Sequence, residues 1–150
     1  SQLGYVRLLP ALWLAEGHLR RGERTTARPL IEIVFDNSRT AGYHYLEGLA
    51  HRLLGDCRAV ESPSIAEEHV ATAIGILGRI GARNELAKAF VTQAMLREAA
   101  GDPATARQLL DQASTIFLGL GTRDESKWVE AARAALDHGA PARPEPAEPA

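Results

Sequence analysis

The chain has 150 residues, a formal net charge of -2, and charged side chains at 24% of its positions. A balance this close to neutral excludes the strong single-sign field of a protein that binds nucleic acid or an anionic membrane. The single cysteine, Cys57, excludes an internal disulfide and a multi-cysteine metal site. Since we find no secretory signal and no apolar run near the ~18 residues of a membrane span, we expect a cytoplasmic protein.

The composition predicts an all-α fold. Leucine and alanine dominate, valine and isoleucine are scattered, and no sustained two-residue alternation is present. In chain order, we predict seven helices, over residues 7–21, 24–39, 41–54, 64–80, 84–100, 103–119 and 123–137. The tail, 139–150, is rich in proline and has little to bury, so we expect it to be disordered.

Several helix ends carry local signals. Gly101 can adopt the left-handed conformation that closes a helix, Asp102 can cap the next helix, and Pro103 suits its first position. A turn this short forces the two helices to pack antiparallel. Ser64 and Thr122 are each followed by a glutamate three residues later, which predicts a capping box at both positions. Ser62-Pro63 gives an alternative start for the helix at 64–80.

The glycine–acid turn recurs. Gly22, Gly55 and Gly101 are each followed by an acidic residue, and small residues occur at matching distances around them. The middle copy fits this alignment only with about six residues inserted after Gly55. Helices approach closely where side chains are small, and hairpins with an uncovered apolar face stack on one another. We therefore predict a solenoid over residues 1–138, with hairpins at 7–39, 41–80 and 84–119 and a capping helix at 123–137.

The clearest copy resembles the tetratricopeptide repeat family. Its small–small–large–small pattern is Ala94, Ala106, Leu110 and Ala113, with Gly101-Asp102 at the turn, and the resemblance covers about residues 8–137. It implies a right-handed superhelix of stacked antiparallel hairpins. The period is nearer ~40 than ~34 residues, the first-helix aromatics are partly replaced, and the closing proline is absent. With its longer period, the chain is similar to the C-terminal helical tails of large bacterial signalling ATPases and cyclase-linked regulators. This resemblance implies that the chain is a regulatory part of a larger protein.

Candidate catalytic and metal residues are few. The sequence contains neither a phosphate-binding GxxxxGK[ST] loop nor an HExxH motif. His44, Glu47 and His51 share one helix face, but one helix seldom completes a metal site, so we expect packing or surface roles for them. His69 replaces an apolar repeat position, which indicates a partly buried histidine, and Cys57 has no arrangement that activates a thiolate. We therefore predict no enzyme activity, no cofactor and no metal.

The remaining candidate is the concave face of the solenoid, lined by the first helix of each hairpin. Aromatic, methionine and arginine side chains there are typical of interaction surfaces. We predict a non-catalytic interaction module or scaffold that binds a peptide, a helix or a neighbouring domain, through Trp13, Glu16, Arg20, Tyr45, Leu49, Arg52, Lys88, Thr92, Met95 and Glu98.

Two alternatives remain open. The first is a small-molecule effector sensor attached to a signalling ATPase or a transcription activator, which a deep pocket with convergent polar groups would favour. The second is self-association, because solenoid ends expose an apolar face. We expect the N-terminal end, around Leu8, Leu9, Leu12 and Trp13, to pair with another copy or with residues that precede it in a longer chain.

Overall fold

The computed structural model describes residues 2–138, apart from the side chains of residues 2, 3 and 123–126. This part of the chain is built from α-helices without strands, which confirms the all-α prediction. The predicted tail, 139–150, lies outside the described residues. The helices are α1 (Gln2–Arg20), α2 (Arg24–Ala41), α3 (His44–Arg58), α4 (Pro63–Ile80), α5 (Arg83–Ala99), α6 (Pro103–Leu120) and α7 (Arg123–His138).

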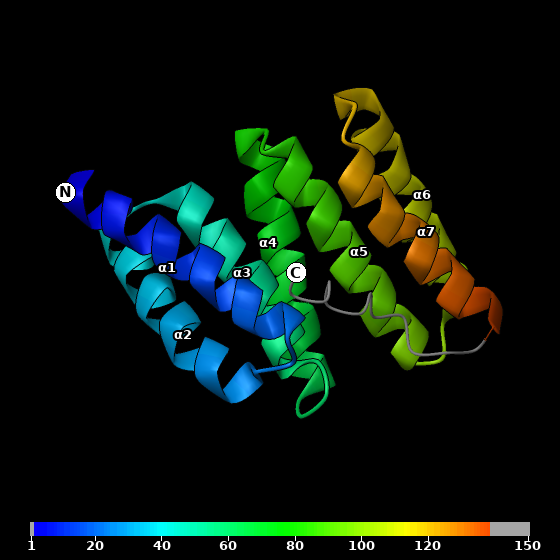
Figure 1. Ribbon diagram of the computed structural model, residues 1–150, viewed down its shortest axis with the longest axis horizontal. Helices are drawn as coiled ribbons and strands as arrows, with labels where there is room; N and C mark the ends of the chain where they lie inside the picture. Colours follow the sequence, from blue (N-terminus) through cyan, green and yellow to red (C-terminus); the bar gives the residue numbers. More distant parts are fainter. Residues whose placement is uncertain (1, 139–150) are drawn as a thin grey trace.

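The helices form two layers (Figure 1). The odd-numbered helices α1, α3, α5 and α7 pack side by side in an inner layer, each against the next. The even-numbered helices form the outer layer: α2 packs on α1 and α3, α4 on α3 and α5, and α6 on α5 and α7. Each outer helix therefore joins two inner helices, and side chains of successive inner helices face one another.

Left-handed glycines mark a regular repeat. α2, α4 and α6 end at Gly42, Gly81 and Gly121, which have φ of 74°, 72° and 71° and are almost evenly spaced along the chain. The predicted turn at Gly101 is confirmed, with a φ of 85°. Asp102 caps α6, because its Oδ1 accepts a hydrogen bond of 3.2 Å from the backbone N–H of Thr105.

The predicted turn at Gly55 is wrong. α3 runs over His44–Arg58 instead of ending at 54, so Gly55 lies inside the helix and the turn follows at 59–62. A Cβ on Gly55 would lie 2.3 Å from Cγ2 of Val70 on α4. The glycine is needed for close approach of two helices, not for a change of chain direction. No insertion is needed in the middle repeat, because Gly55 occupies the position that Ala94 has in the following repeat.

The two predicted capping boxes have different outcomes. α4 begins at Pro63 with Ser62 as its N-cap residue, so Ser64 lies within the first turn, and the carboxylate of Glu67 pairs with Arg97 on α5. The Thr122 hydroxyl donates a hydrogen bond of 3.3 Å to the Phe117 carbonyl. The glutamate that would complete this second box is among the side chains outside the described part.

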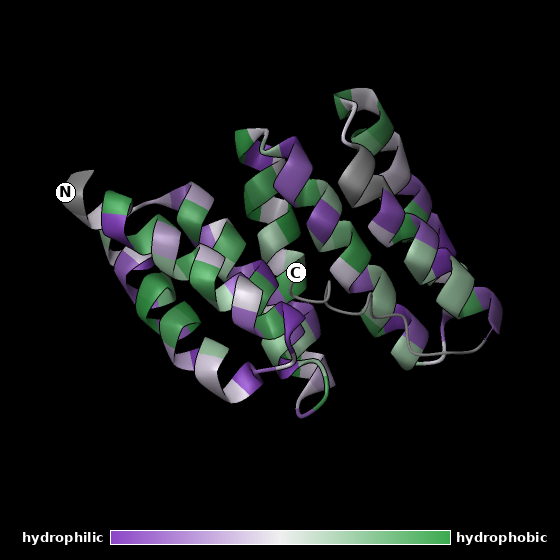
Figure 2. Cartoon of the chain, viewed as in Figure 1, coloured by the Kyte–Doolittle hydropathy of each residue, from purple (hydrophilic) through white to green (hydrophobic). Residues whose placement is uncertain are grey.

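The apolar core is divided along the stack. One large cluster joins α1, α2 and α3 through residues such as Leu12, Ile31 and Leu53. A second joins α5, α6 and α7 around the fully buried Phe117. Two small clusters connect the middle of the stack: Ala66 and Val70 with Leu96, and Ala73 and Leu77 with Ala89. Figure 2 shows hydrophobic and hydrophilic residues alternating along the helices, as amphipathic helices in layers require.

Candidate functional site

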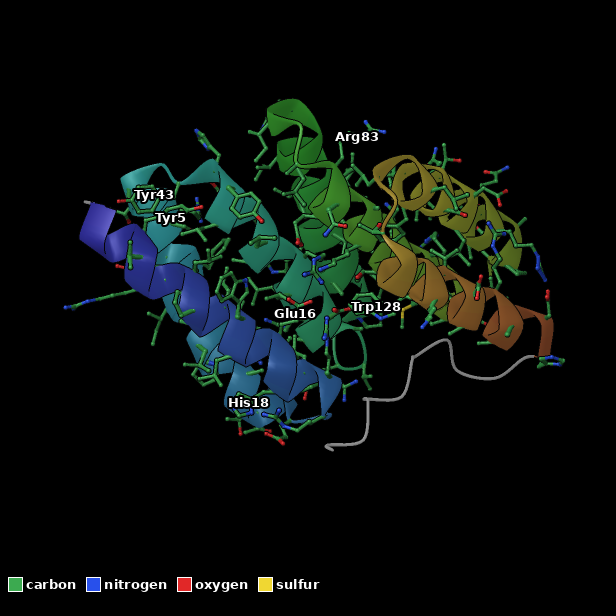
Figure 3. The ribbon with its side chains drawn as sticks, turned by 45° about the horizontal axis from the view of Figure 1, so that its top comes forward. Tyr5, Glu16, His18, Tyr43, Arg83 and Trp128 are labelled. Carbon is green, nitrogen blue, oxygen red and sulfur yellow. The ribbon has the colours of Figure 1, made fainter. Side chains whose placement is uncertain are left out.

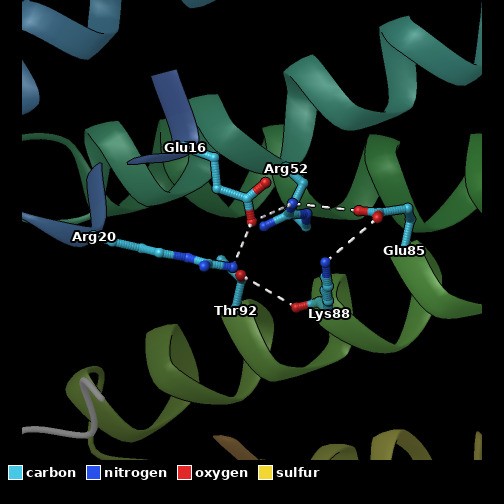
Figure 4. A network of polar contacts seen from close by, with 6 residues as sticks. All are labelled: Glu16, Arg20, Arg52, Glu85, Lys88 and Thr92. Atoms are coloured by element: carbon cyan, nitrogen blue, oxygen red, sulfur yellow. Dashed lines mark hydrogen bonds and ion pairs between the residues drawn. The ribbon is translucent and has the colours of Figure 1, made fainter. Parts of the chain in front are cut away.

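A buried arginine connects three successive inner helices. Arg52 of α3 is 3% exposed. Its Nη2 donates to Oε1 of Glu16 on α1 at 3.2 Å and to Oε2 of Glu85 on α5 at 3.3 Å (Figure 4). Because burying a charge is costly unless it is paired, these carboxylates are needed to hold the guanidinium inside the fold.

Two further cations extend this group to the last helix. Arg20 Nη2 lies 3.5 Å from Oε1 of Glu16, and Lys88 Nζ lies 3.5 Å from Oε1 of Glu85. Both cations also lie over the Trp128 ring of α7, with Arg20 Cζ 4.8 Å and Lys88 Nζ 5.6 Å from its centroid. These are cation–π distances, and Figure 3 shows Glu16 and Trp128 on neighbouring parts of the inner layer. We call Glu16, Arg20, Arg52, Glu85, Lys88 and Trp128 the inner-face cluster.

The cluster favours the ionised forms of Glu16 and Arg52. Burial alone would raise the pKa of the Glu16 carboxyl, but Arg52, Lys88 and Arg20 outweigh it and hold that pKa below its ordinary value. Burial alone would lower the pKa of Arg52, but Glu16 and Glu85 outweigh it and hold that pKa above its ordinary value. Glu16 and Arg52 therefore form an ion pair at neutral pH.

Asp56 and Thr92 lie beside the cluster. Burial raises the pKa of the Asp56 carboxyl, and the nearby Arg52 and a hydrogen bond with Thr92 offset only part of that effect. Thr92 is 6% exposed, and its hydroxyl also lies 3.3 Å from the Lys88 carbonyl oxygen. Burial raises the pKa of the neighbouring Tyr45 phenol as well, and Glu85 adds to the rise. This side of the site is therefore desolvated.

Comparisons with protein-family models, curated proteins and solved structures found no match to this chain.

The structure brings four of the ten predicted face residues into the inner-face cluster: Glu16, Arg20, Arg52 and Lys88. The others lie elsewhere. Leu49 is buried in the first core cluster and Thr92 is buried beside the inner-face cluster. Tyr45 and Met95 pack partly buried against core clusters, Glu98 is half-buried, and Trp13 is 62% exposed on α1.

The predicted face lacks two members of the inner-face cluster, Glu85 and Trp128, and the adjacent Asp56. Glu85 lies one turn before Lys88 on the same helix, so this acid–base spacing is a signal that the sequence does contain. Asp56 was assigned to a turn because Gly55 was read as a helix end. Trp128 was assigned to the capping helix, and its contact with Arg20 depends on how α7 returns to the inner layer.

His44 and His51 both lie within 4 Å of Glu47 on α3, as their shared helix face predicts, and His51 also contacts a histidine of the neighbouring helix. His51 Nδ1 on α3 lies 3.0 Å from His69 Nδ1 on α4, and the Phe35 ring packs edge-on against His51. Burial lowers the pKa of His51 to about 4, and the nearby His69 and Arg39 add to the fall. Burial also lowers the pKa of His69. A neutral pair, in which one ring donates and the other accepts, fits this geometry.

Other chemistry considered in the sequence has little support in the described residues. Among the side chains that the structure describes, no three or more His, Cys, Asp or Glu residues gather in a way that could hold a metal ion. Cys57 is buried, burial raises the pKa of its thiol, and its Sγ donates to the Arg24 carbonyl at 3.8 Å. Among the described helices, none combines the length and hydropathy needed to span a membrane.

Proposed function

We propose that the chain is a non-catalytic protein–protein interaction module with the tetratricopeptide-like, right-handed arrangement that its resemblance implies, working in the cytoplasm. Its inner layer binds a peptide, a helix or a neighbouring domain of a larger signalling protein. The observation that carries this proposal is the inner-face cluster, in which side chains from α1, α3, α5 and α7 converge. A surface built from four separate helices is continuous enough to hold a segment of another protein.

The cluster divides into a structural part and an accessible part. Arg52 is buried, with its guanidinium between two carboxylates, so it fixes the spacing of the inner helices. Arg20 keeps 54% of its side chain exposed and Trp128 is half-buried, so these two remain within reach of a partner. Arginine and tryptophan are the residue types most enriched at energetically important interface positions.

The accessible part indicates what the partner segment contains. The Arg20 guanidinium can pair with an incoming carboxylate, and the Trp128 ring beneath it can contact an apolar or aromatic side chain. We therefore infer a preference for segments in which an acidic residue lies next to an apolar one. Such a segment would replace solvent on Arg20 without displacing the buried Arg52 pairs.

A displayed random-peptide library tests this proposal. Peptides retained by the purified chain are sequenced, synthesised and titrated calorimetrically against Arg20→Ala, Trp128→Ala and a matched control, Arg28→Ala. Arg28 is also a half-exposed arginine paired with a glutamate, but it lies on α2 in the outer layer. We expect acidic–apolar peptides whose affinity falls about tenfold or more in the first two variants and is unchanged in the control.

Two results would overturn the proposal. One is a library from which no peptide binds. The other is a set of peptides that bind Arg20→Ala and Trp128→Ala as tightly as the native chain, since their site would then lie elsewhere. Far-UV circular dichroism of each variant shows that α7 and the rest of the fold are retained before affinities are compared.

A further inference from the structure

The accessible part of the inner-face cluster combines ring faces with positive charge. Trp128 on α7 is half-buried, and Arg20 over its ring keeps 54% of its side chain exposed. Tyr45 on α3 is half-buried as well, and burial and the nearby Glu85 raise the pKa of its phenol, so this ring lies beside the cluster. Aromatic faces bind proline-rich segments and guanidinium groups bind carboxylates, so the surface suits a segment that carries both.

Arg20 has capacity for a further carboxylate. The inner-face cluster contains three cations and two carboxylates, and the buried Arg52 contacts both carboxylates, at 3.2 and 3.3 Å. Arg20 shares Glu16 at the longer distance of 3.5 Å and from a mostly exposed side chain. A guanidinium carries five N–H donors in a planar fork, and one shared carboxylate occupies only part of them. An incoming carboxylate therefore pairs with Arg20 rather than with Arg52.

The chain itself contains a segment of the complementary composition. The tail, residues 139–150, reads GAPARPEPAEPA and contains four prolines, two glutamates and one arginine. Glu145 and Glu148 each lie between two apolar residues. This is the acidic–apolar composition that the proposed function assigns to a bound segment.

The spacing of the two glutamates suits one-sided recognition. Proline-rich segments favour the polyproline II conformation, which has three residues per turn. Glu145 and Glu148 are three residues apart, so in that conformation both carboxylates point to the same side, whereas Arg143 points to a different side. A segment of this kind loses little conformational entropy on binding, because proline has already restricted it.

Chain geometry brings the tail within reach of the inner-face cluster. α7 ends at His138, ten residues after Trp128, and ten helical residues span ~15 Å. Glu145 lies seven residues after His138, and seven residues of polyproline II span ~22 Å. The chain is therefore long enough to turn back along α7 and place Glu145 at Arg20, whose Cζ lies 4.8 Å from the centroid of the Trp128 ring.

The covalent connection favours the tail over a separate peptide of the same composition. A short tether gives the attached segment an effective concentration on the order of mM at its site. A segment whose dissociation constant is itself about 1 mM then occupies the surface about half of the time. A free peptide of equal affinity at micromolar concentration would leave that surface empty.

We propose that the inner layer binds the tail of its own chain, with Glu145 paired with Arg20 and the prolines packed on the Trp128 and Tyr45 rings. The tail and an external partner then compete for one surface, so the tail lowers the apparent affinity for that partner. This inference rests on the proposed function, because the same side chains bind both segments.

A spin label on the tail tests this contact in the whole chain. Cys57→Ser and Trp13→Phe leave Trp128 as the single tryptophan and allow one thiol to be introduced by Ala147→Cys. A nitroxide on that thiol should broaden the indole N–H signal of Trp128 in NMR spectra, relative to the same sample after reduction with ascorbate. Adding Arg20→Ala should weaken this broadening, because the tail loses the guanidinium that holds it.

Charge reversal separates binding of the tail from mere proximity. Glu145→Lys with Glu148→Lys leaves the tether and its reach unchanged but removes the charge complementarity, so the broadening of Trp128 should weaken. The matched control, Glu61→Lys with Glu68→Lys, reverses two exposed glutamates near the start of α4 and should keep the broadening of the native tail. Equal broadening with the native and the charge-reversed tail overturns the proposal.

Mixing two samples shows whose tail is bound. A spin-labelled chain without isotope label is mixed with an isotope-labelled chain that carries no nitroxide. The expected result is no broadening of the Trp128 signal in the mixture, because each tail binds its own inner layer. Broadening in the mixture equal to that within one chain overturns the intramolecular arrangement.

Peptide titration tests the competition. The library-selected peptides should bind the chain with Glu145→Lys and Glu148→Lys about twofold or more tightly than the native chain, and the Glu61→Lys, Glu68→Lys control as the native chain does. Equal affinity for all three chains overturns the competition. The NMR measurement needs no peptide, so a library without binders refutes the proposed function while the broadening still decides whether the tail binds.

Discussion

Replacing Gly55 with alanine tests the close contact between α3 and α4. The added Cβ would lie 2.3 Å from Cγ2 of Val70 and 3.3 Å from the carbonyl oxygen of Ala66. Val70 is β-branched and fully buried, so it has few other rotamers to adopt. Overpacking of this kind costs about 1–3 kcal/mol, and the higher helix propensity of alanine returns up to about 1 kcal/mol. We expect a net loss of about 1–2 kcal/mol in the free energy of unfolding.

Urea denaturation followed by circular dichroism measures this loss, with Gly75→Ala as the control. Gly75 also lies within a helix, α4, but a Cβ there meets nothing within 4 Å. The control should gain up to about 1 kcal/mol. Combining Gly55→Ala with Val70→Ala should cost less than the sum of the two single changes, because the smaller side chain relieves the clash. If Gly55→Ala is as stable as Gly75→Ala, the close approach of these helices is refuted.

Three further changes test other parts of the fold. His51 has a folded-state pKa of about 4, so between about pH 6.5 and pH 4 the unfolded chain binds more protons. The free energy of unfolding should fall by about 2–3 kcal/mol as the pH falls through that window. Urea denaturation at a series of pH values measures this fall. A free energy of unfolding that does not change with pH contradicts the burial of His51. Asp102→Ala should lower the midpoint of thermal unfolding by removing the α6 cap, whereas Asp102→Asn should keep most of that stability. Phe117→Ala should cost about 3–5 kcal/mol in chemical denaturation, because the ring is fully buried, and a smaller loss would show that the second cluster collapses around the gap.

Local signals predicted the helical class and several boundaries. Gly101 favours a helix end, Asp102 a helix cap and Pro103 the first position of a helix. The turn lies where these three preferences predict it. Gly55 misled the prediction because glycine serves both turns and close helix contacts, and the two uses look alike in sequence. Gly42, which does end α2, has no acidic residue after it and was not recognised as a turn.

The inner-face cluster was harder to predict than the helices. Spacing along single helices found Glu16, Arg20, Arg52 and Lys88, because each lies on the inner side of its own helix. It missed Trp128, whose contact with Arg20 joins the last helix to the first. Helical periodicity orients side chains around one axis, but distances between helices far apart in sequence depend on how the whole stack curves.

Arg52 has a consequence for the shape of the stack. The two large apolar clusters lie on either side of a middle region joined by alanines, a few larger side chains and this guanidinium. The ion pairs of Arg52 with Glu16 and Glu85 therefore link α1, α3 and α5 between the two large clusters. Shortening that one side chain would change the distances among three helices that are far apart in sequence, while leaving every other residue of the chain unchanged.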